Sequence, residues 1–356
     1  MRQRKCKYIF SVMMLLIILL GMAACGKTSD SKESESAKPA GSTDSITKIG
    51  IVLDIGGLQD GSFNQLVWEG ASRAVEELGV AAEYKESESE ADYARNIKEF
   101  LEEDCDLIIA AGYMLADAVR TAAVANPHQR FAIIDDDSCG ELENVSCLIF
   151  DHEQSAYLVG LVAGTMTKTD IVGIVIGKTS KTMNRFGYGY CAGVKDANPN
   201  AQILQMNANS YSDAQIGSVD ASYMINDGAD VIFHAAGGVG KGVIEACQER
   251  GVYAIGVDVD QSSLAPETVL TSAMKRVDTA IYQVIEQMKD GKFQNGETSF
   301  GLAEEGVSIA PTGDLLSEEL QRMLEEKKQK IIQGEIVVPA DQKTFEASYG
   351  DIYEMD

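Results

Sequence analysis

The chain has 356 residues, of which 45% are hydrophobic, and its formal charge at pH 7 is −25. This length suits two lobes of ordinary domain size, each with its own apolar core. The strongly negative charge argues against nucleic acid as the main partner, because contacts to phosphates need a positive surface.

The N-terminus has the pattern of an export signal. Basic residues at the start are followed by the apolar run YIFSVMMLLIILLGMAA, which ends in small residues directly before Cys25. This predicts a lipoprotein signal peptide over residues 1–24, with a lipid on Cys25; a plain membrane anchor without lipid is the alternative. Residues 25–45 are Ser-rich and aperiodic, which predicts a flexible tether. We therefore expect a folded domain held at the extracytoplasmic face of the cell membrane.

From Ile46 onward, strand-like and helix-like segments alternate. The first helix should begin at Ser62, where Ser62 and Gln65 fit a capping box, and should end at Gly79. The regular alternation predicts an α/β fold. Six short β-branched runs suit strands covered on both faces of a parallel sheet: KIGIVLD, DLIIAAG, FAIIDDD, IVGIVIG, ADVIFHAAG and VYAIGVDVD.

The length of this pattern favours two lobes. We expect Phe150–Met166 to form a helix that enters the second lobe, a helix beginning after Ser272 to return to the first, and a third crossing to precede residues 300–311. The expected ranges are 46–149 plus 272–295 for lobe 1, and 150–271 plus 296–356 for lobe 2.

Candidate ligand contacts lie where strands end, because open parallel sheets bind ligands beyond the carboxyl ends of their strands. Between the strand that ends at Asp54 and the helix at Ser62 stand Asp60, Phe63 and Asn64. An aromatic ring there can stack on a planar ligand. The alternative is that Phe63 is a core residue and Asp60 a turn former.

Other predicted strand ends carry Asp135, Phe186, a glycine run that includes Gly237, and Asp258, and Lys275 follows a crossing. Together these residue types describe a cleft of mixed apolar and polar character. The neighbouring Arg185 is expected to be a structural ion-pair partner.

Catalytic and metal motifs are not found in the sequence. The Walker pattern around Lys241 fails, because Ala235 and Gly242 occupy required positions, and the dinucleotide pattern starting at Gly238 fails at Val243. We expect no metal site, because no second oxygen-rich loop accompanies the acidic residues 135–137. The cysteines show no metal spacing, and sequence alone leaves a Cys139–Cys147 bridge open.

Five segments in this order resemble the basic membrane protein family: GGLQDGSFNQLVWEG, NRFGYGYCAGVKDANP, GADVIFHAAGGVGKGVIEA, GVYAIGVDVDQ and VLTSAMKRVD. The similarity covers Ile46 to Pro311. This family consists of lipoprotein substrate-binding proteins of ABC transporters that bind purine nucleosides. The resemblance implies a two-lobed periplasmic-binding-protein type I fold with three hinge crossings. It also implies a monomer without cofactor or catalysis, which closes on its ligand and delivers it to a permease with a separate ATPase subunit.

The resemblance also implies roles for particular residues. In the D-x-S-F-N motif, formed by Asp60, Ser62, Phe63 and Asn64, the Phe63 ring would stack on the base and Asn64 would lie beside its edge. Asp135 would read the base.

On the opposite side, Phe186 would cover the other face of the base, and Gly237 and Gly238 would let main chain approach the ligand. Asp258 would accept hydrogen bonds from the ribose hydroxyls, and Lys275 would donate to the sugar.

This chain departs from the family pattern at residues 153–157 and in the segment IGKTSKTMNRF. The preferred nucleoside therefore stays open. A receptor of the same fold for a free sugar or a signalling ligand is an alternative, and a nucleoside hydrolase is a further one.

Overall fold

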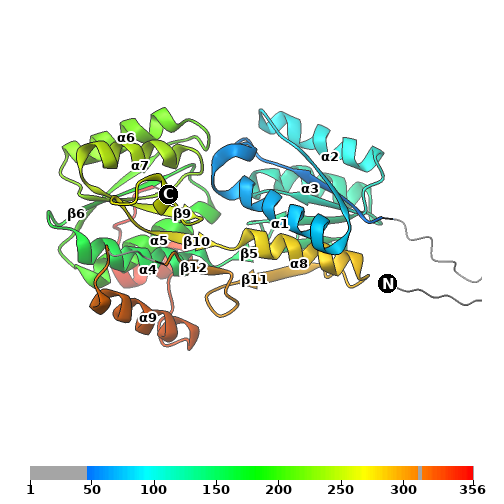
Figure 1. Cartoon of the computed structure of the whole chain (residues 1–356). Coiled ribbons are helices and arrows are strands. Elements are labelled where there is room, and N and C mark those ends of the chain that lie inside the picture. The colour runs from blue at the N-terminus through cyan, green and yellow to red at the C-terminus, as the bar shows by residue number, and fades with distance from the viewer. Residues whose placement is uncertain (1–45, 312–314, 356) are drawn as a thin grey trace, which may run out of the picture. The chain divides into compact units, whose positions relative to one another are not determined.

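The computed structural model describes residues 46–311 and 315–355. These residues form two α/β lobes, each built on a six-stranded sheet (Figure 1). The predicted signal peptide, tether and lipid-carrying Cys25 lie outside the described residues.

The first sheet has the strand order β11-β5-β4-β3-β1-β2, and all its strand pairs are parallel. Helices α1 and α8 contact each other, as do α2 and α3. The strands are β1 (Lys48–Val52), β2 (Ala81–Lys85), β3 (Leu107–Ala110), β4 (Arg130–Ile134), β5 (Val145–Phe150) and β11 (Gly296–Phe300); the α-helices are α1 (Phe63–Leu78), α2 (Tyr93–Glu102), α3 (Ala116–Ala125) and α8 (Val277–Lys289); the short 3-10 helices are η1 (Leu58–Asp60), η2 (Glu90–Asp92) and η3 (Tyr113–Leu115).

The second sheet has the order β12-β10-β9-β8-β6-β7. It is parallel except for the edge strand β12, which pairs antiparallel with β10, so the expected parallel sheet has one exception. The strands are β6 (Ile171–Ile176), β7 (Gln202–Asn207), β8 (Val231–Ala235), β9 (Tyr253–Asp258), β10 (Val269–Lys275) and β12 (Val307–Ile309); the helices are α4 (His152–Met166), α5 (Lys181–Ala197), α6 (Ala214–Asn226), α7 (Val239–Arg250), α9 (Glu318–Ile332), α10 (Gln342–Tyr349) and the 3-10 turn η4 (Ser262–Leu264).

Both faces of each sheet are covered, which explains why the strands are continuously apolar. In β1, Ile49 and Ile51 join one hydrophobic cluster, whereas Val52 joins a second one together with residues of α2 and α3. In the second lobe, α6 and α7 contribute to a third cluster. The predicted α/β class and the strand-helix alternation are confirmed.

The chain crosses between the sheets three times: from β5 into α4, from β10 into α8, and between β11 and β12. Two crossings differ from the expected positions. Residues 273–275 continue β10, where they pair with β9 and β12, so the returning helix begins only at Val277. Gly296–Phe300 pairs with β5 and belongs to the first sheet. The lobe boundaries therefore fall near Lys275 and Phe300 rather than at residues 272 and 296.

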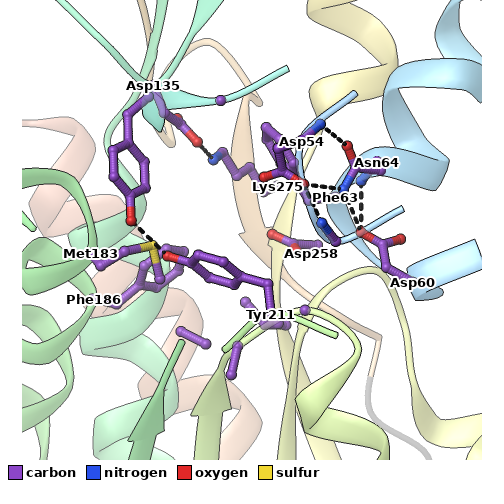
Figure 2. A pocket seen from close by; sticks show the side chains of 17 residues that line it. Asp54, Asp60, Phe63, Asn64, Asp135, Met183, Phe186, Tyr211, Asp258 and Lys275 are labelled. Carbon is purple, nitrogen blue, oxygen red and sulfur yellow. Dashed lines mark hydrogen bonds and ion pairs between the residues drawn. The ribbon is translucent and has the colours of Figure 1, made fainter. Parts of the chain in front are cut away.

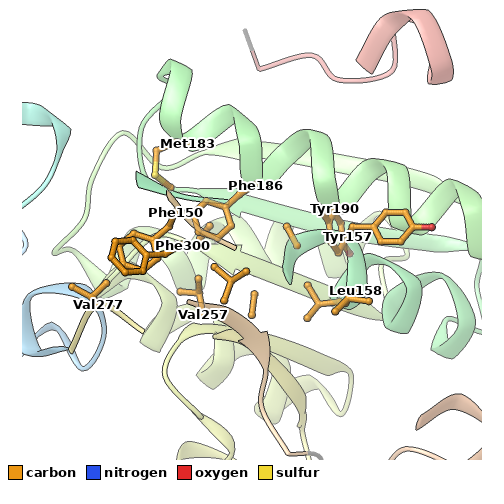
Figure 3. Close-up of a cluster of buried hydrophobic side chains, with 14 of the residues drawn as sticks. Phe150, Tyr157, Leu158, Met183, Phe186, Tyr190, Val257, Val277 and Phe300 are labelled. Carbon is orange, nitrogen blue, oxygen red and sulfur yellow. The ribbon is translucent and has the colours of Figure 1, made fainter. Parts of the chain in front are cut away.

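The crossings are packed together by aromatic and ionic contacts. The rings of Phe150 and Phe300 stack with their centroids 5.1 Å apart (Figure 3). Arg185 forms ion pairs with Asp151 at 2.9 Å and with Glu153 at 2.7 Å, which confirms its predicted structural role. Burial raises the pKa of Glu153 to about 7 although the guanidinium opposes this.

The five cysteines between residues 105 and 247 are buried and free, so Cys139 and Cys147 are not bridged. Within residues 46–311 and 315–355, no helix has the length and apolar character needed to cross a bilayer. The same residues contain no cluster of His, Cys, Asp and Glu arranged to hold a metal ion.

Candidate functional site

A pocket with an empty volume of about 530 Å³, part of it open to solvent, lies where the carboxyl ends of both sheets meet (Figure 2). Eight of the ten predicted ligand-binding residues line it: Asp60, Phe63, Asn64, Asp135, Phe186, Gly237, Asp258 and Lys275. Ser62 and Gly238 are not among the lining residues. The structure thus brings the predicted residues together, and their contact with a ligand stays a prediction.

The α1 N-terminus is built differently from the expected capping box. Ser62 is the N-cap residue, but its side chain makes no capping bond. Instead the Asp60 carboxylate accepts hydrogen bonds from the main-chain N–H groups of Ser62 and Asn64, both at 2.8 Å. The Ser62 hydroxyl is free to reach the other lobe, where it donates to Asp258. The capping-box prediction was wrong, because Asp60 satisfies the helix end.

Asn64 is held rigidly beside the pocket. Its amide nitrogen donates to Oδ1 of Asp54 at 2.7 Å, and the same oxygen accepts the N–H of Gly56 at 2.8 Å. Burial raises the pKa of Asp54 and of Asp60, with the hydrogen bonds to their carboxylates opposing it. Much of the Asn64 amide is therefore engaged by protein, and Asp54 is an additional polar group at the pocket.

Lys275 lies at the centre of the site. Its ammonium group forms an ion pair with Oδ2 of Asp135, and both side chains are almost fully buried. The ammonium nitrogen also lies 4.9 Å from the ring centroid of Phe63 and 5.0 Å from that of Phe150, which are cation–π distances. The other Asp135 oxygen, Oδ1, is buried and has no partner within the described residues. That oxygen can accept a hydrogen bond from a ligand.

Asp258 faces the pocket from the end of β9. Burial raises its pKa to about 6, while the Lys275 ammonium and the Ser62 hydroxyl oppose this shift. At neutral pH the carboxylate is therefore mostly ionised. Its pairing with Ser62 joins the two lobes directly.

The aromatic lining contains both predicted phenylalanines and two tyrosines that were not predicted, Tyr113 and Tyr211. Phe63 is half-buried at the pocket wall, whereas Phe186 is 3% exposed and one of its faces stacks on His152 with centroids 4.1 Å apart. Tyr211 is a further half-buried ring in the lining, and its hydroxyl lies 3.0 Å from that of Tyr113 across the cleft. The main-chain oxygen of Tyr211 accepts the N–H of Gly238 at 2.8 Å.

Sequence reasoning missed nine lining residues: Asp54, Gly56, Gly112, Tyr113, Met183, Tyr211, Ala235, Ala236 and Val257. Several of these immediately follow a recognised strand, so strand ends alone could have indicated them. Tyr211 follows β7, an edge strand whose mixed sequence QILQMN gave no strand signal.

The rim of the cleft carries three lysines of the second lobe that all reach the first. The contacts are Lys178 to Glu90 at 3.3 Å, Lys181 to Asp137 at 2.6 Å and Lys241 to the main-chain oxygen of Gln59 at 2.7 Å. We call these side chains the rim lysines. Each contact is partly exposed and individually weak.

Two α/β lobes with three crossings and a pocket between their strand ends define a two-lobed solute-binding protein of the periplasmic-binding-protein type. Residues 46–342 match the Bmp family model, described as "ABC transporter substrate-binding protein PnrA-like", and the chain therefore belongs to this family. The resemblance to the basic membrane protein family is thus confirmed. The family consists of substrate-binding proteins of ABC transporters and not of enzymes.

Two relatives are similar to this chain over nearly its whole length. The "CD4+ T-cell-stimulating antigen" of Listeria innocua is 38% identical over 94% of this chain and 99% of its own length. The "ABC transporter nucleoside-binding protein BmpA" of Lactococcus lactis is 31% identical over 92% of this chain and 98% of its own. A solute-binding protein of an ABC transporter system from Aeropyrum pernix has a similar crystal structure, with a TM-score of 0.78, 28% identity, and coverage of 85% and 96% of the two chains.

Proposed function

We propose that the protein captures purine nucleosides outside the cytoplasmic membrane and delivers them to an ABC permease. The observation that carries this proposal is the composition of the pocket, where half-buried aromatic rings from both lobes stand beside buried carboxylates. A nucleoside presents a flat ring system and a vicinal diol, and these two features match the two kinds of lining group. The name of the Lactococcus lactis relative supports a nucleoside ligand.

In this proposal the base lies against Phe63. Tyr211 is better placed than Phe186 to cover the opposite face, because Phe186 is only 3% exposed whereas Tyr211 is half-buried in the pocket lining. Each stacking contact contributes about 0.5–1.5 kcal/mol beyond the buried area. The unpaired Oδ1 of Asp135 accepts an N–H group from the edge of the base.

The sugar lies toward Asp258. An ionised carboxylate can accept hydrogen bonds from both hydroxyls of a ribose, and such charge-assisted bonds are stronger than neutral ones. The ribose would then replace the Ser62 hydroxyl as partner of Asp258. Lys275 is close to both acids and can donate to the sugar.

The pocket suits a nucleoside better than a nucleotide. Among the described residues that line it, Lys275 is the one cation, and its ammonium group is already paired with Asp135. A phosphate group would add two negative charges beside several buried carboxylates. We therefore expect nucleoside monophosphates to bind much more weakly than nucleosides.

Capture follows from lobe closure. Ser62 with Asp258, Tyr113 with Tyr211, and the rim lysines all join the lobes. A ligand that touches both lobes favours the closed state because it makes its full set of contacts only there. We propose that the closed monomer, anchored by a lipid on Cys25, docks on the permease while a separate ATPase subunit supplies energy. X-ray scattering with equal compactness in the presence and absence of bound ligand would contradict closure.

Isothermal titration calorimetry with adenosine, guanosine, inosine, cytidine and ribose tests the ligand assignment. We expect the purine nucleosides to bind, cytidine to bind more weakly, and ribose not to bind measurably. Binding of ribose without any nucleoside would favour the free-sugar alternative and refute the proposal. Adenosine 5′-monophosphate serves as the charged control.

A further inference from the structure

The loop that carries Asp258 has an unusual backbone conformation. Asp258 ends β9 with a φ of 64°, in the left-handed region that non-glycine residues adopt rarely, although aspartate tolerates it better than most. Such a conformation persists where surrounding contacts hold it. These contacts come from His234, Gln261 and Ser272, which lie outside the pocket lining and have no role in the function proposed above.

Gln261 is the centre of these contacts and is 2% exposed. Its side-chain oxygen accepts the main-chain N–H of Val257, the residue before Asp258, at 3.0 Å. The same oxygen lies 2.9 Å from Nε2 of His234. Because an amide oxygen only accepts, His234 donates from Nε2. The Gln261 side chain thus joins the two ends of the short loop from Asp258 to Gln261, and it also connects this loop to β8 through His234.

The main chain of Gln261 is tied to the other neighbouring strand. Its N–H donates to the Ser272 hydroxyl of β10 at 3.1 Å. The loop is therefore fixed to both strands that flank β9 in the sheet order β10-β9-β8. A shift of Gln261 would move the main chain on both sides of Asp258.

Two glycines make room for this network. A Cβ at Gly256 would lie 2.4 Å from the Ser272 hydroxyl oxygen and 2.6 Å from the Gln261 side-chain oxygen. A Cβ at Gly240 would lie 1.9 Å from Cε1 of His234. A larger residue at either position would therefore displace these side chains.

We propose that Gln261 is a positioning residue that holds the Asp258 carboxylate where it can accept both hydroxyls of a vicinal diol. Gln261 acts through Asp258, and with His234 and Ser272 it sets the preference for ligands with an intact 2′,3′-diol. This inference rests on the proposed function for the identity of the ligand. The positioning of the Asp258 loop by Gln261 does not depend on which ligand binds.

The variant Gln261→Leu keeps most of the side-chain volume and removes the acceptor. Calorimetry compares the Kd of guanosine with that of its 2′,3′-dideoxy analogue in the wild type and in the variant. We expect guanosine affinity to fall on the order of tenfold in the variant. The dideoxy analogue should change little, so that the ratio of the two Kd values shrinks. An unchanged ratio, including an equal loss for both ligands, would overturn the inference.

Ile244→Ala is the matched control, because Ile244 is buried in α7 of the same lobe and does not line the pocket. It should lower Tm without changing the ratio. If it shrinks the ratio as Gln261→Leu does, general loosening of the lobe explains the effect and the inference fails.

A crystal structure of ligand-free Gln261→Leu tests the positioning without any ligand. We expect the Asp258 backbone to leave the left-handed region and its contact with Ser62 to be lost. An unchanged loop would overturn the inference. Absence of nucleoside binding by the wild type would instead refute the proposed function, and this structure would still decide the positioning.

Discussion

Asp135 and Asp258 occupy matching positions in the two lobes. Asp135 directly follows β4 and Asp258 ends β9, which are each the third strand in the order of their sheets. Their φ angles are 63° and 64°. Lys275, from the strand beside β9, pairs with Asp135 and opposes the raised pKa of Asp258. One ammonium group thus stabilises the negative charge of two buried carboxylates. Because a single cation cannot engage all four of their oxygens, acceptor oxygens remain for a ligand.

Replacing Asp258 with alanine should abolish most nucleoside binding. Two charge-assisted hydrogen bonds to the ribose would be lost, which together contribute about 3 kcal/mol or more, so the Kd should rise at least roughly a hundredfold. Isothermal titration calorimetry measures the Kd of the wild type and of the variant. Asp260→Ala is the control, since Asp260 is exposed two residues further along. Wild-type affinity in Asp258→Ala would refute the ribose role of this carboxylate.

Nucleoside affinity should fall on acidification. The ionised Asp258 accepts the ribose hydroxyls, and its pKa in the free protein is about 6. Below that pH binding must first remove a proton, so the Kd should rise about tenfold for each further pH unit. Calorimetry at pH 4.5 to 8 gives the profile, and buffers of different ionisation enthalpy reveal the released proton. A flat profile that matches that of Asp258→Asn would contradict this prediction.

The ionised Asp258 carboxylate should lower the free energy of unfolding of the ligand-free protein. Its folded pKa, about 6, lies above the ordinary value of 3.8. Between these values the folded state binds more protons, so its contribution to the free energy of unfolding decreases as pH rises from about 4 to 6 and stays low above that. The loss amounts to at most about 3 kcal/mol for a shift near two pH units.

Asp258→Asn should therefore have a higher Tm than the wild type at pH 7.5. The difference should shrink toward pH 4, where the wild-type carboxyl is protonated in both states. Thermal denaturation across this range is the measurement. A Tm difference that is constant with pH would show that ionisation of Asp258 is not its cause.

The Lys275–Asp135 pair should show strong energetic coupling. Lys275→Met leaves a buried carboxylate without its cation, and breaking such a pair costs about 3–5 kcal/mol of unfolding free energy. Adding Asp135→Asn to this variant should restore part of the stability, because Asp258 is then the one carboxylate of the two that still lacks the Lys275 cation. Denaturant unfolding of both single variants and the double variant gives the coupling energy. Additive losses would show that the two groups act independently.

Tyr211 and Phe186 can be separated as candidates for the second stacking ring. Tyr211→Leu should weaken nucleoside binding by about tenfold with a small change in Tm, because Tyr211 is half-buried at the pocket. Phe186→Leu should mainly lower Tm, because Phe186 packs on His152 and Phe233. Calorimetry of both variants measures the loss of nucleoside affinity, and thermal denaturation measures the change in Tm. A large loss of affinity in Phe186→Leu with little change in Tyr211→Leu would instead identify Phe186 as the second stacking ring.

The sequence was sufficient to predict the central strands and eight of the seventeen residues that line the pocket. Strands such as β3 and β8 are apolar throughout because both sheet faces are covered, and the polar residues that follow such strands converge at one edge. Edge strands gave no such signal. β2 and β7 are largely exposed or half-buried and have mixed sequences, and Tyr211, which follows β7, was missed for that reason.

Contacts between distant segments could not be read from local patterns. Ser62 and Gln65 fit a capping box, yet Asp60 caps the helix, since the Ser62 hydroxyl pairs with Asp258 far along the chain. Residues 273–275 were predicted to begin the returning helix, yet they extend a strand because β9 and β12 lie on either side of it. In both cases tertiary partners override the local preference.

The rim lysines have a consequence for how long a captured molecule stays bound. Closing two halves of a chain with a formal charge of −25 brings like charges together, and lysines that all extend from one half offset part of that repulsion. Dissolved ions screen such exposed attractions within about 8 Å at physiological ionic strength. Salt therefore weakens both the attraction of these lysines and the repulsion between the acidic halves, so the residence time of a ligand should depend on ionic strength less steeply than the lysine contacts alone would predict.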